Sequence, residues 1–150
     1  MYQLFLYVHI ICAVIWVGGA LYAQLLALRV TRSSDPSELP HLARHVEFIG
    51  ARVFMPAALL LFVAGTAMTL QAWSFGQTWI AVSVALWVLS AVVGAVYLGP
   101  RVKRAAELFE AEGPTSQEGL ELINRLFVVS RLELIWFAVV IALMTFKPGA

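Results

Sequence analysis

The amino-acid sequence predicts an all-α protein, a bundle of four transmembrane helices that forms a single integral membrane domain over residues 1–150. Of the 150 residues, 61% are hydrophobic and only 13% are charged, whereas a soluble domain is about half apolar and a quarter charged. Four segments are each apolar over the roughly 20 residues that a helix needs to cross a bilayer. Since lipid offers no hydrogen-bond partners, a helical bundle is the economical way to satisfy the backbone of four such spans.

The four spans are expected to cover about residues 4–28, 53–70, 79–98 and 126–146. The first lacks the basic start and the small-residue cleavage site of a secretory signal peptide, so it is expected to be retained. The short connection "QAWSFGQT" between the second and third spans carries no charge and is bracketed by Trp73 and Trp79. Aromatic residues of this kind gather where helices meet the membrane surface.

The basic residues predict the orientation of the bundle. The two long connections hold eight of them, whereas the other side of the spans has only Lys147. An excess of Lys and Arg marks cytoplasmic connections. Both termini are therefore expected outside and both long connections in the cytoplasm; the eight residues are Arg29, Arg32, Arg44, Arg52, Arg101, Lys103, Arg104 and Arg125.

Both long connections are predicted to form amphipathic helices. The first is expected to begin near Pro40 and to run into the second span, where Pro56 would bend the helix. The third span is expected to stop near Gly99 and Pro100, and a separate charged helix should follow. No Gly-rich phosphate loop, CxxC pair or nucleophile motif occurs in the sequence. A net charge of +1 is too small to indicate nucleic-acid binding.

His9 is the first candidate site residue, because an ionisable group in an apolar span is costly. Counting back from Arg29 places His9 near the outer edge of the hydrocarbon region. His9, Cys12 and Trp16 share one helical face, and Gly19 continues it and is expected to leave open space. Neutral imidazole is a common metal ligand that haem iron accepts. The alternative is an interfacial histidine bonded to water or a tyrosine.

Two methionines are possible second ligands at a similar depth. Met68 lies in the second span and Met144 in the fourth. Each could instead be ordinary apolar packing.

Arg131 and Glu133 form the second candidate, near the cytoplasmic end of the fourth span. Two residues apart on a helix, they point to nearly opposite faces, so each needs another partner, with Arg52 plausible for Glu133. They are either structural, as an ion pair with another partner or a snorkelling arginine, or functional, with an anion or propionate clamp at Arg131 and proton handling at Glu133.

His41 and His45 are the third candidate. Their spacing of one helical turn could hold a metal, yet no HExxH-type context accompanies them, and solvated histidines are the simpler interpretation. Cys12 is the single cysteine, so an intramolecular disulfide is excluded.

The first helix, "HIICAVIWVGGALY", resembles that of the HemJ-type protoporphyrinogen oxidases, small bacterial four-helix membrane proteins. The matching positions are His9, Trp16, Gly18, Gly19 and Tyr22, and the ending "LMTFKPGA" is similar too. A copper-resistance D-type membrane domain shares the His-then-Trp-Gly-Gly helix. So does an uncharacterised family of predicted integral membrane proteins that also ends in a Met-then-Lys-Pro pattern.

The HemJ resemblance implies a haem b bound through His9. The residues expected around this haem are Trp16, Gly19 and Tyr22 of the first helix, with Met68 and Arg131 added by their positions in the other spans. The third-helix lysine of those oxidases has no counterpart in the span 79–98, where Ser83 stands at about that place. The leading hypothesis is therefore a haem-binding protein of the bacterial cytoplasmic membrane, with electron transfer or oxidation of a lipid-accessible substrate as its role.

Two other functions remain open. His9, Cys12 and methionine sulfur would suit Cu(I) handling. A packed bundle could instead serve as a non-catalytic subunit of a larger membrane complex or as a homo-oligomer.

Overall fold

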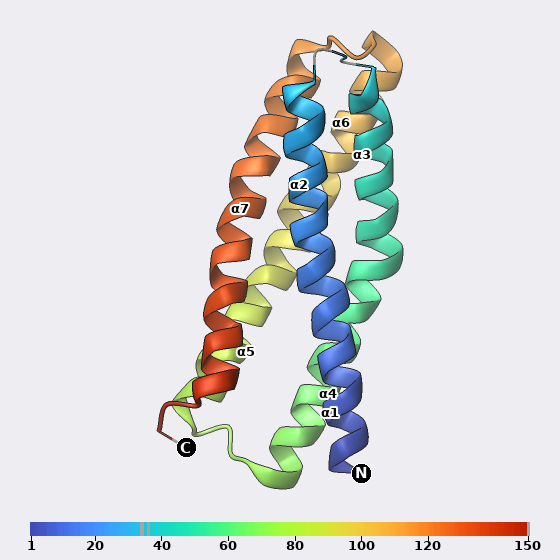
Figure 1. Ribbon diagram of the computed structural model, residues 1–150. Helices are drawn as coiled ribbons and strands as arrows, with labels where there is room; N and C mark the ends of the chain where they lie inside the picture. Colours follow the sequence, from blue (N-terminus) through green and yellow to red (C-terminus); the bar gives the residue numbers. More distant parts are fainter. Residues whose placement is uncertain (34, 36, 150) are drawn as a thin grey trace.

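A computed structural model describes residues 1–33, 35 and 37–149 and consists of four long helices packed antiparallel (Figure 1). Both termini lie at one end of the bundle, together with the connection 73–77; we call this the terminal end. The other two connections lie at the opposite end, the loop end. The elements are α1 (Tyr2–Ala13), η1 (Val14–Gly18), α2 (Gly19–Arg32), α3 (Glu38–Ile49), η2 (Gly50–Phe54), α4 (Met55–Ala72), α5 (Thr78–Val92), η3 (Val93–Leu98), α6 (Gly99–Glu112) and α7 (Gln117–Phe146).

The prediction of a four-helix membrane bundle is confirmed. Four continuous helices, Tyr2–Arg32, Glu38–Ala72, Thr78–Glu112 and Gln117–Phe146, are each long and apolar enough to cross a membrane. The described residues contain no strand. A helix of 35 residues is about 50 Å long, against about 30 Å of hydrocarbon. The helices therefore extend well beyond the bilayer, and the predicted amphipathic helices are continuous extensions of the spans.

The third span does not stop at Gly99 and Pro100, contrary to the sequence-based expectation. The helix passes through the π-helical segment η3 and continues as α6, with Pro100 in the first turn of α6. A similar π-helical segment, η2, precedes Pro56. Proline lacks an N–H and its ring crowds the carbonyl four residues earlier. A widened π-helical turn before each proline lets the helix absorb that defect without ending.

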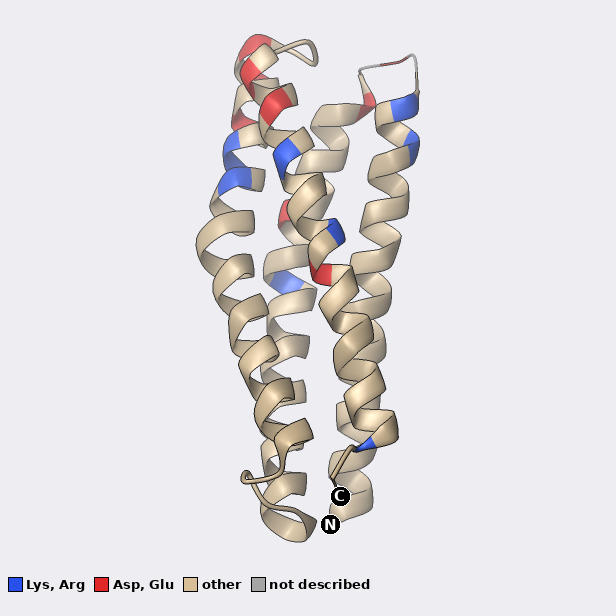
Figure 2. Cartoon of the chain, turned by 90° about the vertical axis from the view of Figure 1, so that its left-hand side faces the viewer, with Lys and Arg blue, Asp and Glu red and all other residues tan. Residues whose placement is uncertain are grey.

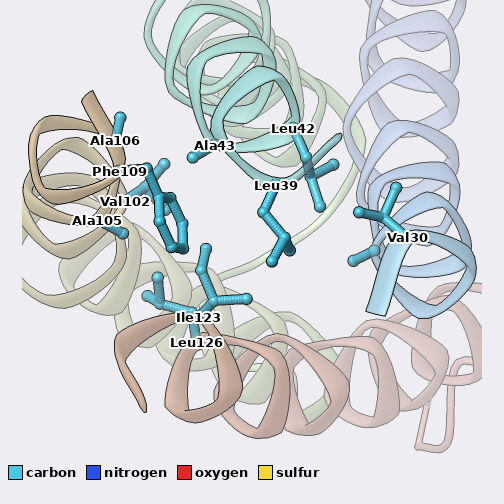
Figure 3. Packing of buried hydrophobic residues seen from close by; sticks show 11 residues of the cluster. Val30, Leu39, Leu42, Ala43, Val102, Ala105, Ala106, Phe109, Ile123 and Leu126 are labelled. Carbon is cyan, nitrogen blue, oxygen red and sulfur yellow. The ribbon is translucent and has the colours of Figure 1, made fainter. Parts of the chain in front are cut away.

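The main hydrophobic core lies at the loop end. Its side chains come from all four long helices and fill the space between them (Figure 3). Gly119 makes room for this ring, because a Cβ there would lie 2.6 Å from Phe109 Cε1. Because the helices are longer than the bilayer is thick, this end is expected to project out of the lipid, where burial from water stabilises the core. The cluster consists of Ala27, Val30, Leu39, Leu42, Ala43, Val102, Ala105, Ala106, Phe109, Ile123 and Leu126.

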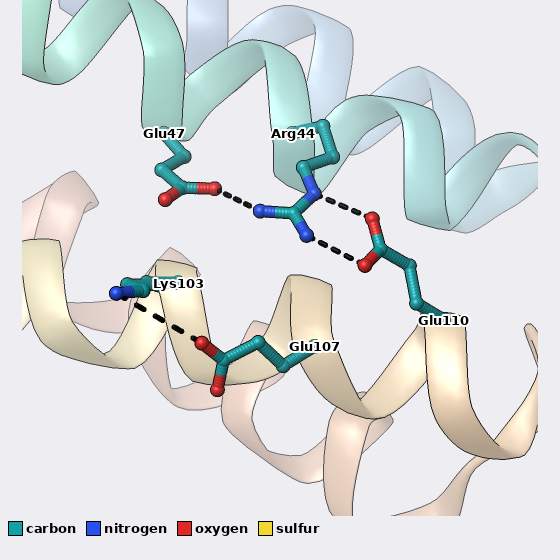
Figure 4. A network of polar contacts seen from close by, with 5 residues as sticks. All are labelled: Arg44, Glu47, Lys103, Glu107 and Glu110. Atoms are coloured by element: carbon teal, nitrogen blue, oxygen red, sulfur yellow. Dashed lines mark hydrogen bonds and ion pairs between the residues drawn. The ribbon is translucent and has the colours of Figure 1, made fainter.

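Charged residues gather in the loop-end half of the bundle (Figure 2). There Arg44 joins two helices: its Nε and Nη2 each donate to Glu110 at 2.6 Å, and its Nη1 donates to Glu47 at 2.8 Å (Figure 4). Lys103 lies 4.0 Å from Glu107, one turn further along α6. All of these groups are at least partly exposed to solvent, so they are expected to add little to stability.

The half of the bundle near the terminal end is built from two helix pairs. In this half α1 packs along α4 and α5 along α7 (Figure 1). Large aromatic side chains bridge the pairs. Phe62 stacks on Trp87 with ring centroids 4.2 Å apart, and Trp16 packs against Phe137 at 4.9 Å. Trp87 Nε1 also donates to the Ala58 carbonyl at 3.2 Å.

An aromatic cluster closes the terminal end, as expected for a membrane surface. Trp73 and Trp79 meet edge to face with centroids 5.3 Å apart. Lys147 ends α7 in a left-handed conformation and places its Nζ 4.6 Å from the Trp73 centroid and 5.7 Å from that of Trp79. Tyr2 joins the cluster by accepting a hydrogen bond from Trp73 Nε1 at 3.3 Å.

Replacing Lys147 by methionine should lower the free energy of unfolding by about 0.5–1 kcal/mol, since the side chain keeps its length but loses its attraction to the two indole rings. The measurement is a denaturant titration of the purified protein in detergent. Lys147→Arg is the matched control and should keep wild-type stability. Equal stability of the methionine variant and the wild type would show that the cation–π contact contributes nothing.

Candidate functional site

The imidazole of His9 lies half-buried between α1 and α4. Its Nδ1 is 2.9 Å from the backbone carbonyl oxygen of Leu61. Gly65, one turn further along α4, provides the space: a Cβ there would lie 3.0 Å from His9 Cε1 and 3.1 Å from Nδ1. A small residue at position 65 therefore allows the ring to lie against the α4 backbone.

This hydrogen bond determines which ring nitrogen carries the proton. A carbonyl oxygen can only accept, so Nδ1 must be the donor. In the neutral ring Nε2 then has a free lone pair, and no described residue forms a hydrogen bond with it. Histidines that bind metal are oriented in this way, with one nitrogen donating to a carbonyl or carboxylate and the other facing the metal.

Cys12 and Trp16 continue from His9 toward the middle of the bundle, as the spacing predicts. Cys12 is buried, and the Trp16 ring contacts Phe137 of α7. The expected open space beside Gly19 does not exist, because the Phe54 ring of η2 occupies it and would overlap a Cβ at position 19. Tyr22 is 64% exposed and points away from the bundle interior.

Met144 lies at about the same depth as His9. Trp16 and Phe137 are in contact on antiparallel helices. His9 lies two helical turns from Trp16, and Met144 lies two turns from Phe137 in the same direction along the bundle. Met68 is on α4, one turn beyond Gly65, and both methionines are half-buried.

Glu133 is a buried carboxylate on α7, only 8% exposed, whereas Arg131 is exposed. Their opposite orientations agree with the prediction. The expected partnership of Glu133 with Arg52 is not formed, and no described residue makes an ion pair or hydrogen bond with the Glu133 carboxylate. One turn to either side of Glu133, α7 makes polar contacts with other helices: Ser130 Oγ donates to Gln24 Oε1 and Trp136 Nε1 donates to Ser90 Oγ, both at 2.6 Å.

His41 and His45 are exposed on α3 at the loop end. They line a surface hollow of about 170 Å³ together with Glu38 and apolar residues of α2 and α3. Within the described part of the chain, no group of three His, Cys, Asp or Glu side chains is arranged to hold a metal ion.

Comparison with known families decides the affiliation of the chain. Residues 3–148 match the model of a family described as predicted integral membrane protein (DUF2269). The chain belongs to this family. The match agrees with the resemblance to an uncharacterised group of integral membrane proteins. No curated protein and no solved structure matches the chain.

For this DUF2269 protein, several residues around the candidate site could not be recognised from sequence. The Leu61 carbonyl has no side-chain signature. In the sequence Gly65 lies four residues before Thr69, and such pairs of small residues are typical of helix packing and do not point to a histidine site. Phe54 and Ser130 carried no signal at all, because their partners lie on other helices.

Proposed function

We propose that this DUF2269 protein binds haem b in the membrane, with His9 Nε2 as an axial ligand, and that it has a redox role. That role is electron transfer or the oxidation of a substrate that enters from the lipid. One observation carries the proposal: the hydrogen bond from His9 Nδ1 to the Leu61 carbonyl directs the proton to Nδ1 and leaves Nε2 free to ligate iron. The resemblance of the first helix to the HemJ-type oxidases supports the same assignment.

The two helix pairs suit this role. His9 belongs to one pair and Met144 to the other, at about the same depth, and the pairs are bridged by aromatic rings. The Nδ1–Cε1 edge of the imidazole faces α4. Since Met68 is on that same helix, Met144 is the better-placed candidate for the opposite ligand. Histidine and methionine together are an established pair of haem ligands.

The protein would determine the properties of the haem through its own side chains. A bound haem supplies one-electron chemistry, and the ligands and the polarity of the pocket tune it. Cys12 and Trp16 make the helix face next to His9 apolar. Arg131 lies about 20 Å along α7 from Met144, so a clamp on the haem propionates by Arg131 would require the group to reach far toward the loop end.

The test is the absorption spectrum of the protein after expression in haem-replete cells and purification in detergent. We expect a Soret band, and α and β bands of a b-type haem after reduction by dithionite. A colourless protein that also fails to take up added haemin would contradict the proposal.

Copper is the second candidate, favoured by the burial of Cys12 one turn from His9 on the same helix face. Thiolate, imidazole and thioether are ligands that suit Cu(I). Elemental analysis of the purified protein separates the two functions: copper that is lost in Cys12→Ser, together with a missing Soret band, would replace the haem assignment.

A further inference from the structure

A surface hollow on the loop-end half of the second long helix contains none of the residues proposed to bind haem. It measures about 320 Å³ and is lined by Arg44, Glu47, Phe48, Ala51 and Arg52. It therefore combines two guanidinium groups, one carboxylate and an aromatic ring within three turns of one helix.

Of the two arginines in the hollow, one forms ion pairs and the other does not. Arg44 is held by Glu110 and Glu47 through three hydrogen bonds of 2.6–2.8 Å (Figure 4). Arg52 is exposed, and no described residue forms an ion pair or a side-chain hydrogen bond with it. Arg52 is thus the available positive charge, and its planar fork of N–H donors matches the geometry of a phosphate.

Arg52 also marks a change in the surface of this helix. On the side toward the loop end, α3 carries Glu38, His41, Arg44, His45 and Glu47. On the other side no charged residue occurs from Val53 to Ala72. Met55, Leu59 and Leu60 there expose 51–54% of their surface, and Phe48 beside the hollow exposes 61%. A boundary between polar and apolar surface is where the headgroups of a bilayer meet its hydrocarbon.

We propose that this hollow binds the headgroup of an acidic phospholipid. The Arg52 guanidinium donates to the lipid phosphate, Phe48 lies against the glycerol region, and the acyl chains follow the apolar surface around Met55 and Leu59. Selectivity for an acidic lipid follows from the charge of the lining. Glu47 is the one carboxylate among the lining residues, it is already paired with Arg44, and two arginines line the hollow beside it. The lining therefore carries a net positive charge, which favours a lipid with a net negative headgroup over a zwitterionic one.

The test is lipid binding measured by native mass spectrometry of the full chain in detergent, titrated with phosphatidylglycerol or phosphatidylcholine. The wild type should retain phosphatidylglycerol preferentially. Arg52→Gln should weaken that binding about fivefold, as expected for the loss of one basic residue at a lipid surface. Arg52→Lys should show an intermediate loss, since it keeps the charge but not the fork.

Arg131→Gln is the matched control, because Arg131 is also exposed and outside the hollow. It should change phosphatidylglycerol binding less than twofold. Equal binding by the Arg52→Gln variant and the wild type, or equal losses in the Arg52 and Arg131 variants, would overturn the proposal. So would wild-type binding that does not distinguish the two lipids.

Discussion

Replacing His9 by alanine will abolish the Soret band of the purified protein. The variant loses the Nε2 lone pair that the hydrogen bond from Nδ1 to the Leu61 carbonyl makes available. The other two histidines, His41 and His45, lie at the loop end of the bundle and cannot replace it. The measurement is the ratio of Soret absorbance to protein absorbance after identical haem-replete expression. His45→Ala, at an exposed position of the loop end, should keep the wild-type ratio.

A second variant separates ligation from folding. His9→Asn places an amide N–H where Nδ1 now donates to Leu61, so the helix contact can survive, but it has no counterpart of Nε2. We expect this variant to show the helical circular dichroism of the wild type and no haem. An unchanged Soret band in both His9 variants would assign the ligand to another residue.

Phe109→Ala will destabilise the protein by about 3–5 kcal/mol, the usual cost of removing a large aromatic side chain from a well-packed core. Phe109 is only 2% exposed, and its ring lies against Gly119 within the loop-end cluster. This cluster lies in the part of the bundle that extends beyond the bilayer, where water drives burial. The measurement is the free energy of unfolding in detergent.

Leu60→Ala is the control for this prediction. Leu60 is 54% exposed on the apolar surface of α4, so its truncation should change stability by less than about 0.5 kcal/mol. If both substitutions destabilise the protein equally, the loop-end cluster is not its main folded core.

Much of the fold could be predicted because the hydrophobic runs are long and the loop sequences are amphipathic. The four spans, their helical extensions and the opposite orientations of Arg131 and Glu133 all follow from local patterns. The continuation of the third helix through Pro100 could not be predicted in this way, because a π-helical turn absorbs the proline and leaves no distinct sequence signal.

The candidate site was predictable only in part. His9, Cys12 and Trp16 share a face because helical periodicity dictates it. The partner on the other side of each face depends on how the helices rotate and pack against one another. Phe54 fills the space beside Gly19, and Glu133 does not pair with Arg52; single-helix periodicity has no information about either contact.

The central claim, that His9 Nε2 ligates haem iron, is tested most directly by adding imidazole to a His9→Gly variant. The purified variant is mixed with haemin, and the Soret band is followed as free imidazole is titrated. We predict weak haem binding without imidazole and a saturable return of the wild-type band with it, because the free ring replaces the missing side chain. A wild-type band in His9→Gly before any imidazole is added would contradict the account.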